Sequence, residues 1–91
     1  MINSNQFIDI AKHAVLNYVC TQLDPTERYA VNLDNIYVVW FCKTLQNWKA
    51  LLSTTLPDEM YYELTYNGDK QEYYLDAYKK WENIKTKFTF E

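Results

Sequence analysis

The sequence is poor in the residues that build loops and many catalytic sites. Its 91 residues include one glycine, two prolines, two cysteines and one histidine. So little glycine and proline excludes collagen-like, linker and low-complexity chains. A single glycine also excludes the glycine-rich loops that hold phosphates. The lone His13 has no second histidine or cysteine at ligand spacing, so we predict no metal site.

Positive charge is scarce as well, and most of all arginine. The chain has nine basic residues against twelve acidic ones, for a net charge of -3, and Arg28 is its only arginine. Nucleic-acid binding depends on clustered lysine and arginine side chains. The lysines from residue 79 onward are interleaved with acidic residues, which is typical of a solvated surface. We therefore expect no nucleic-acid partner.

Long apolar runs are also missing. No stretch approaches the roughly 20 apolar residues of a membrane span, and no basic leader precedes an apolar core at the start. We expect a cytoplasmic protein with no membrane partner. Cys20 and Cys42 each lie inside an apolar run, where a thiol usually behaves as a small buried hydrophobe. Both are expected to be reduced and buried in the core.

Aromatic residues, by contrast, are abundant. Nine tyrosines, four phenylalanines and three tryptophans bring the hydrophobic share to 48%. Such a chain buries enough apolar surface to offset the conformational entropy lost on folding. Residues 1–91 are therefore expected to form a single small globular domain.

The first segment has the period of an amphipathic helix. Between residues 5 and 23, apolar side chains recur every three or four positions. Asn3 offers an N-cap oxygen, and Gln6 completes a capping box. Asp24-Pro25 ends the helix, because proline disfavours helical backbone in the residue before it. Residues 24–34 then read as a polar connection.

The middle of the chain predicts three antiparallel strands. Residues 36–44 are β-branched and aromatic without alternation, as in a central strand. Residues 44–47 make a turn with Leu45 and Gln46 as a two-residue loop. Residues 48–55 and 60–66 form the second and third strands, and Pro57-Asp58 separates them.

The segment after Asn67-Gly68 admits two interpretations. This dipeptide is a strong hairpin signal, which favours a fourth strand at 70–75 before a shorter helix. A two-residue hairpin loop would, however, place Glu63 opposite Glu72, and like charges are unfavourable there. The preferred interpretation takes Asp69 as the N-cap of a C-terminal helix with Glu72 in its capping box. Its apolar positions at helical spacing are Tyr73, Tyr74, Ala77, Tyr78, Trp81, Ile84 and Phe88.

The predicted fold class is therefore α+β. An N-terminal helix is followed by a three-stranded antiparallel sheet and a C-terminal helix, with both helices on one sheet face. The alternation of side chains assigns a core face and an opposite face. The core face carries Tyr37, Val39, Phe41, Trp48, Ala50 and Leu52, with Tyr62 and Trp81 also in the core. The opposite face carries Ile36, Val38, Trp40, Cys42, Lys49, Leu51 and Ser53.

The opposite face is too apolar for plain exposure to solvent. An apolar patch with a polar rim is typical of a protein interface, and Trp and Tyr dominate binding there. The predicted protein-binding residues are Val38, Trp40, Leu51 and Tyr61. The alternative is that a loop or helix covers this face. A one-residue change in loop length would exchange the two faces.

No constellation of residues predicts catalysis. Asp58, Glu59, Asp69 and Glu72 are carboxylates in turn and cap positions, and no base stands beside a nucleophile. We predict no catalytic residue and no cofactor. The chain is expected to be a non-enzymatic protein.

Two sequence words are distinctive, VVWFCKTLQNWKALLST and YNGDK. With them, residues 5–84 resemble a family of small proteins of unknown function encoded by phages and prophages of Gram-positive bacteria. The resemblance implies a phage accessory protein in the cytoplasm of a bacterial host, and it assigns no activity. The leading hypothesis is a protein-binding module that acts on a host or phage protein. The alternative is a self-associating structural module, such as a homodimer.

Overall fold

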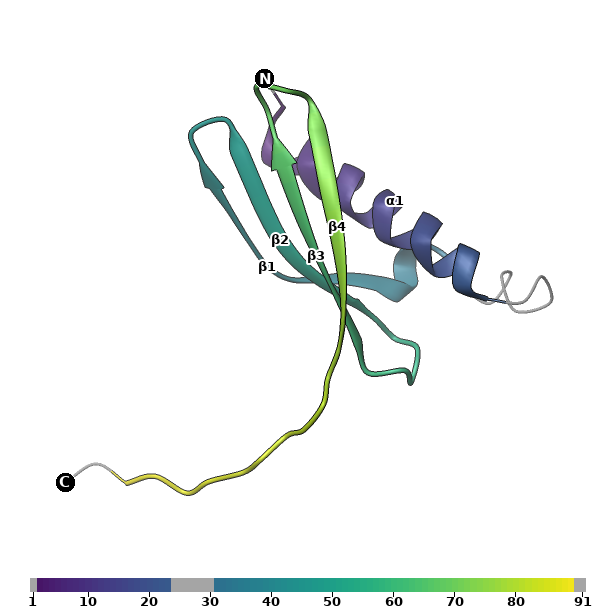
Figure 1. Ribbon diagram of the computed structural model, residues 1–91, viewed down its shortest axis with the longest axis vertical. Coiled ribbons are helices and arrows are strands. Elements are labelled where there is room, and N and C mark those ends of the chain that lie inside the picture. Colours follow the sequence, from purple (N-terminus) through teal and green to yellow (C-terminus); the bar gives the residue numbers. More distant parts are fainter. Residues whose placement is uncertain (1, 24–30, 90–91) are drawn as a thin grey trace.

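One α-helix, one short 3-10 helix and one sheet make up the part of the fold that the structure describes. The computed structural model describes residues 2–23 and 31–89. The elements are α1 (Ser4–Gln22), a short 3-10 helix η2 (Leu33–Asn35), β1 (Ile36–Thr44), β2 (Asn47–Thr54), β3 (Met60–Asn67) and β4 (Glu72–Lys79) (Figure 1). All neighbouring strands are antiparallel, in the order β1-β2-β3-β4. The α+β class and the N-terminal helix are confirmed.

The start of α1 is the predicted capping box. The Asn3 side chain accepts a hydrogen bond from the Gln6 backbone N–H at 2.8 Å, and the Gln6 side chain accepts one from the Asn3 N–H at 2.9 Å. These bonds satisfy backbone donors that a helix N-terminus leaves unpaired. The Pro25 stop signal and most of the connection predicted at 24–34 lie outside the described residues.

The first hairpin also follows the prediction. Thr44 pairs with Asn47, so Leu45 and Gln46 form a two-residue loop. Leu45 has a φ of 57° and its side chain is 83% exposed. Two-residue hairpin loops use positive φ because it matches the twist of the flanking strands.

The predicted C-terminal helix is wrong. Residues 72–79 form β4, and the loop before it has four residues, 68–71, instead of two. In this register Glu63 faces Asp76 and Glu72 faces Asn67, so the Glu63–Glu72 opposition that argued against a hairpin does not arise. The alternative prediction of a fourth strand at 70–75 is closer, but no shorter helix follows within the described residues.

The loop that joins β3 to β4 shows why Asp69 caps no helix. The Asn67 side chain accepts hydrogen bonds from the backbone N–H groups of Asp69, at 3.1 Å, and Lys70, at 3.2 Å. An asparagine that binds the backbone two and three residues on stabilises a turn. The Gly68 N–H donates to the Gln46 carbonyl at 3.1 Å, which joins this loop to the first hairpin.

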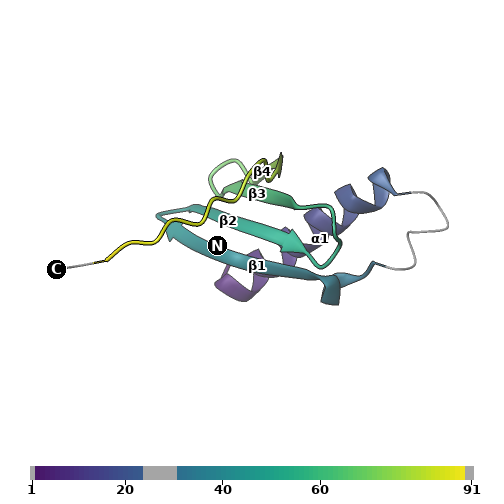
Figure 2. The ribbon, with the colours of Figure 1, turned by 90° about the horizontal axis from the view of Figure 1, so that it is seen from below.

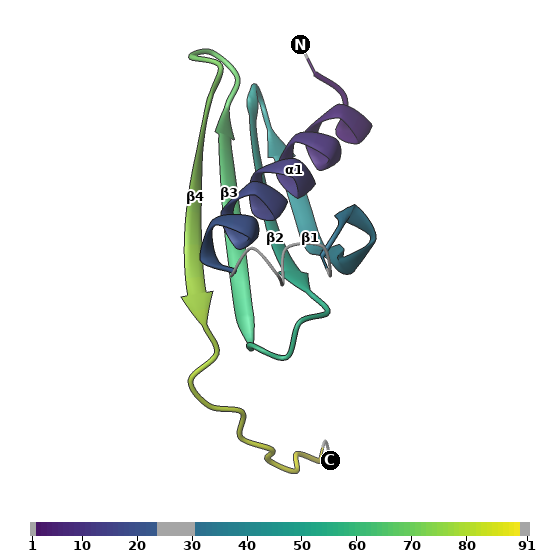
Figure 3. The same ribbon diagram turned by 90° about the vertical axis from the view of Figure 1, so that its right-hand side faces the viewer.

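The core lies between α1 and one face of the sheet (Figure 3). The rings of Phe7 and Trp48 stack with centroids 5.0 Å apart, and Tyr18 meets Tyr62 edge-on at 5.7 Å. Such aromatic pairs stabilise beyond the area they bury. The buried apolar residues are Phe7, Ala11, Ala14, Val15, Val19, Val31, Ile36, Trp48, Ala50, Leu52, Tyr62 and Leu64. Trp81, predicted to be core, is instead 95% exposed.

Because of a β-bulge in β1, the predicted assignment of side chains to the two faces is wrong for the first half of this strand. The pairing of β1 with β2 shifts between Val38 and Trp40, which leaves Val39 as an extra residue. A bulge inserts one residue into one strand and so reverses the alternation beyond it. After the bulge, Phe41 lies on the helix side and Trp40 on the opposite side, as predicted. Before the bulge, each side chain lies on the face opposite to the predicted one.

The reversal affects four residues of β1. Ile36 is buried in the core, and Val38 packs against the core. Tyr37 and Val39, predicted to be core, are each 46% exposed. Val38 therefore does not lie on the face for which protein binding was predicted.

Tyr62 makes the stability of the fold sensitive to alkaline pH. Burial, with smaller contributions from the charges of Asp58 and Tyr18, raises the pKa of Tyr62 to about 12. A tyrosine in the unfolded chain ionises near pH 10. Between these values the unfolded state loses the proton first, so the free energy of unfolding should fall as pH rises from about 10 to 12.

Urea unfolding across this pH range tests the assignment. The free energy of unfolding should decline less steeply with pH for Tyr62→Phe than for the wild type. Tyr37→Phe controls for the loss of one tyrosine, and equal slopes for wild type and Tyr62→Phe would contradict the assignment.

Gly68 is required for close approach and not for an unusual φ. A Cβ at this position would lie far inside van der Waals contact with the Gln46 carbonyl oxygen. Gly68→Ala should therefore push the two turns apart and destabilise the protein by about 1–3 kcal/mol, measured by urea denaturation. Asp69→Ala, in the same loop at an exposed position, is the matched control. Equal stability of the two variants would show that the turns do not depend on this contact.

Candidate functional site

The face of the sheet away from α1 is the candidate site. Among residues 2–23 and 31–89, no helix or strand lies over this face, whereas α1 crosses the other (Figures 1 and 3). We call it the outer face. The strand registers place on it Tyr37, Trp40, Cys42, Thr44, Asn47, Lys49, Leu51, Ser53, Tyr61, Glu63, Thr65, Asn67, Glu72, Tyr74, Asp76 and Tyr78.

These side chains form rows that run across the four strands. One row is Tyr37, Ser53, Tyr61 and Tyr78, and the next is Trp40, Leu51, Glu63 and Asp76. A third row is Cys42, Lys49, Thr65 and Tyr74. The last row, Thr44, Asn47, Asn67 and Glu72, lies beside the hairpin turns. The outer face is therefore aromatic at one end and polar at the other.

The apolar part of the outer face centres on Trp40. This indole is 44% exposed and lies directly opposite Leu51, which is half-buried. Tyr61 is half-buried, and its partner Tyr78 is 52% exposed. Large aromatic side chains that expose this much ring have apolar area available for a partner.

The charges of the outer face are mainly acidic. Glu63, Glu72 and Asp76 supply three carboxylates against the single ammonium group of Lys49. The Lys49 Nζ lies 3.4 Å from a Glu63 carboxylate oxygen. In the described part of the chain, no basic group lies within ion-pair distance of Asp76, which faces Glu63 across the strands. The outer face thus has negative charge beside its aromatic rows.

A hydrogen bond ties the carboxylate of Glu72 to the same surface. The Tyr74 hydroxyl donates to a Glu72 carboxylate oxygen at 2.8 Å. This bond, together with the negative charge of Glu72, raises the pKa of Tyr74. The hydrogen bond thereby holds the Glu72 carboxylate against the third row.

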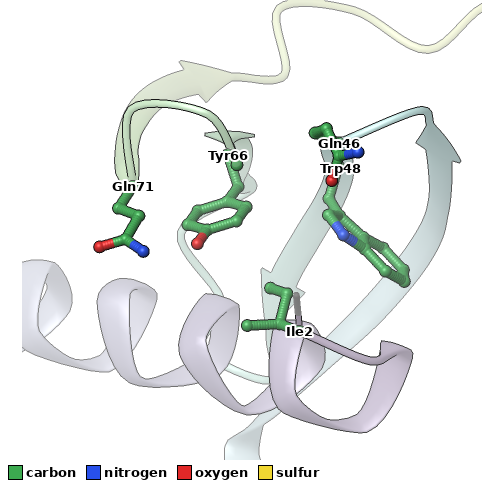
Figure 4. A pocket seen from close by; sticks show the side chains of 6 residues that line it. Ile2, Gln46, Trp48, Tyr66 and Gln71 are labelled. Atoms are coloured by element: carbon green, nitrogen blue, oxygen red, sulfur yellow. The ribbon is translucent and has the colours of Figure 1, made fainter.

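A small pocket lies at the opposite side of the fold, where the N-terminal segment meets the two hairpin turns. Its volume is about 90 Å³ and its lining is Ile2, Gln46, Trp48, Tyr66, Gly68 and Gln71. Figure 4 shows Tyr66 and Gln71 on one side of it and Gln46 and Trp48 on the other. The lining consists of amides, aromatic rings and aliphatic groups, and its volume suits a few water molecules.

The described residues contain neither a metal-binding cluster nor a membrane-spanning helix. Within residues 2–23 and 31–89, no three His, Cys, Asp or Glu side chains come together in a way that would hold a metal ion. No helix in that part of the chain has the length and apolar character needed to cross a membrane.

The structure brings together three of the four residues predicted to bind protein. Trp40, Leu51 and Tyr61 share the outer face, and Val38 lies under α1 because of the bulge. Sequence reasoning missed Tyr37, Tyr74 and Tyr78, which also lie on this face. The alternation of Tyr74, Asp76 and Tyr78 was a signal, but it is visible only when residues 72–79 are read as a strand.

No curated protein and no solved structure matches the chain. The family of unknown function DUF6275 matches residues 8–88, so the chain belongs to this family. The match includes α1 from its second turn, the whole sheet and most of the residues that follow β4.

The two thiols differ in exposure, and the prediction of two buried cysteines is wrong. Cys42 is exposed on the outer face, and Cys20 on α1 is partly buried; both are free. A maleimide reagent should therefore label Cys42 faster than Cys20, because reaction requires access to the sulfur. Mass spectrometry of the Cys20→Ser and Cys42→Ser variants, each with one thiol, measures the two rates. Faster labelling of Cys20 would contradict the register of β1 after the bulge.

Proposed function

We propose that this member of the DUF6275 family is a non-enzymatic protein-binding module that binds a host or phage protein through its outer face. One observation supports this most strongly. Trp40, Tyr37 and Tyr78 expose large parts of their rings on a sheet face that no described helix or strand covers. The exposed aromatic residues of this face are of the types that are enriched at interface cores.

The arrangement of the outer face supports binding to a protein surface. Binding energy at interfaces concentrates in a few central Trp, Tyr and Arg residues that a polar rim shields from water. Here Trp40 and Leu51 occupy the inner rows, and the row of Thr44, Asn47, Asn67 and Glu72 supplies polar groups at one end. A pocket of about 200 Å³ lies toward the polar end of the outer face, beside Cys42, Lys49 and Thr65. It is smaller than the roughly 300–1,000 Å³ of typical small-molecule sites, so the face suits a protein partner better.

The origin of the partner follows from the sequence resemblance. The words VVWFCKTLQNWKALLST and YNGDK resemble small phage and prophage proteins, so we propose an accessory role in the cytoplasm of a bacterial host. The first word runs from Val38 to Thr54 and includes Trp40 and Leu51 of the outer face. The distinctive sequence and the proposed binding surface therefore coincide in part.

Trp40→Ser tests this function. The variant should lose capture of the partner from extracts of an infected or lysogenic host by about tenfold or more, because truncation of a large exposed tryptophan removes a binding hot spot. Quantitative mass spectrometry of the captured proteins provides the measurement. Leu45→Asn is the control, since Leu45 is 83% exposed in the first hairpin turn, outside the aromatic rows, and asparagine tolerates its positive φ.

Circular dichroism separates binding from folding in this experiment. Trp40→Ser should keep the wild-type spectrum, and unaltered capture by that folded variant would overturn the proposal. If Trp40→Ser unfolds, Tyr78→Ser on edge strand β4 tests the same face at a more exposed position. Equal capture by wild type and Tyr78→Ser would then count against the outer face.

A further inference from the structure

The residues after β4 carry apolar side chains that the fold does not bury. We call residues 80–89 the C-terminal tail. Its residues form no helix or strand, Trp81 is 95% exposed and Ile84 is 72% exposed. A tryptophan buries about 150–250 Å² when it packs, so its exposure leaves a large favourable contribution unused. The C-terminal tail therefore has the character of a segment that binds a surface.

The C-terminal tail departs from the sheet on the side of the outer face. Its first residue is held in place, since the Lys80 N–H donates to the Glu59 carbonyl at 2.9 Å. From there the chain runs away from the body, to the side opposite α1, in two perpendicular views (Figures 1 and 2). The backbone of the tail thus leads away from the molecule in both views, and the exposure of Trp81 and Ile84 agrees with this path.

The charge of the C-terminal tail complements that of the outer face. The tail has three basic residues, Lys80, Lys85 and Lys87, and one acidic residue, Glu82. The outer face has three carboxylates and one lysine, and that lysine already pairs with Glu63. A basic segment with a tryptophan matches a surface that is aromatic and acidic, both in apolar area and in sign of charge.

A return of the tail onto its own outer face would need a sharp reversal. Trp81 stands two residues after the end of β4, which leaves almost no chain for a loop. The residues after Gly68 include no glycine or proline, the two residues that most favour tight turns. A second copy of the chain offers the same outer face to an outgoing tail, and no reversal is needed.

We infer that the C-terminal tail of one copy docks on the outer face of a second copy, with Trp81 and Ile84 against Trp40, Leu51 and Tyr61. The exchange is reciprocal, so each contact is made twice around a two-fold axis and the buried area is doubled. This inference rests on the proposed function of the outer face and names an occupant for it. In the free protein, the second copy covers the aromatic rows.

Sedimentation and light scattering of the full chain over a range of concentrations test the exchange. The wild type should show a mass of twice 11.0 kDa as concentration rises. Replacing Trp81 and Ile84 together by serine should raise the dimer dissociation constant by about tenfold or more. These side chains are exposed, so the circular dichroism spectrum should not change. Asn83→Ser, a polar change within the tail, is the matched control and should dimerise as the wild type does.

Mixing two variants distinguishes exchange between copies from docking within one copy. Trp40→Ser keeps an intact tail, and the Trp81→Ser, Ile84→Ser variant keeps an intact outer face. Each alone should be mainly monomeric, whereas their mixture should form a heterodimer held by one tail on one face. Tyr78→Ser replaces Trp40→Ser in the mixture if the latter unfolds. Recovery of the dimer in the mixture supports exchange.

Three results would overturn the inference. They are a wild type that stays at 11.0 kDa at every concentration, a dimer that the serine variant of the tail leaves intact, and a mixture that fails to form a heterodimer. The proposed function fails separately, through capture experiments in which Trp40→Ser binds the partner as the wild type does. A monomeric wild type that captures its partner through Trp40 would exclude only the second copy.

Discussion

The stacking of Phe7 on Trp48 is the contact on which the arrangement of the molecule depends. The two rings, with centroids 5.0 Å apart, join α1 to β2. Trp48 is also stacked by Phe41 at 6.2 Å, and the Lys43 ammonium lies 5.4 Å from the centre of the indole. Because one helix packs here and the described residues contain no other α-helix, only one face of the sheet is covered. The exposure of the outer face follows from this one-sided packing.

The bulge at Val39 decides which side chains of β1 share that exposure. Without it, a strand with one alternation throughout would place Ile36 and Trp40 on the same side. With it, Ile36 is buried and Trp40 lies on the outer face. The extra residue lets one strand supply apolar side chains to the core at its start and aromatic area to the surface beyond. The candidate site therefore depends on a local irregularity of the backbone.

Sequence reasoning correctly placed the parts of the fold that depend on short-range signals. The capping box at Asn3, the strand at 36–44 and the loop of Leu45 and Gln46 each involve residues close together in the chain. Trp40 and Leu51 are predicted to share a face because the two-residue loop of the first hairpin sets their relative parity. Tyr61 is predicted from the alternation within residues 60–66, with Tyr62 in the core. Val38 was misplaced because no sequence pattern indicated where the extra residue of the bulge would fall.

The sequence by itself determined an aromatic α+β chain with an N-terminal helix and a meander of strands, because helical period, capping residues and turn residues act locally. Only the tertiary structure decided the conformation of residues 68–89. There the spacing of Tyr73, Ala77 and Trp81 suits a helix, while Tyr74, Asp76 and Tyr78 suit a strand. The free edge of β3 decides between them, because eight residues pair with it as β4. That pairing leaves Trp81 beyond the sheet, where local pattern alone would have buried it.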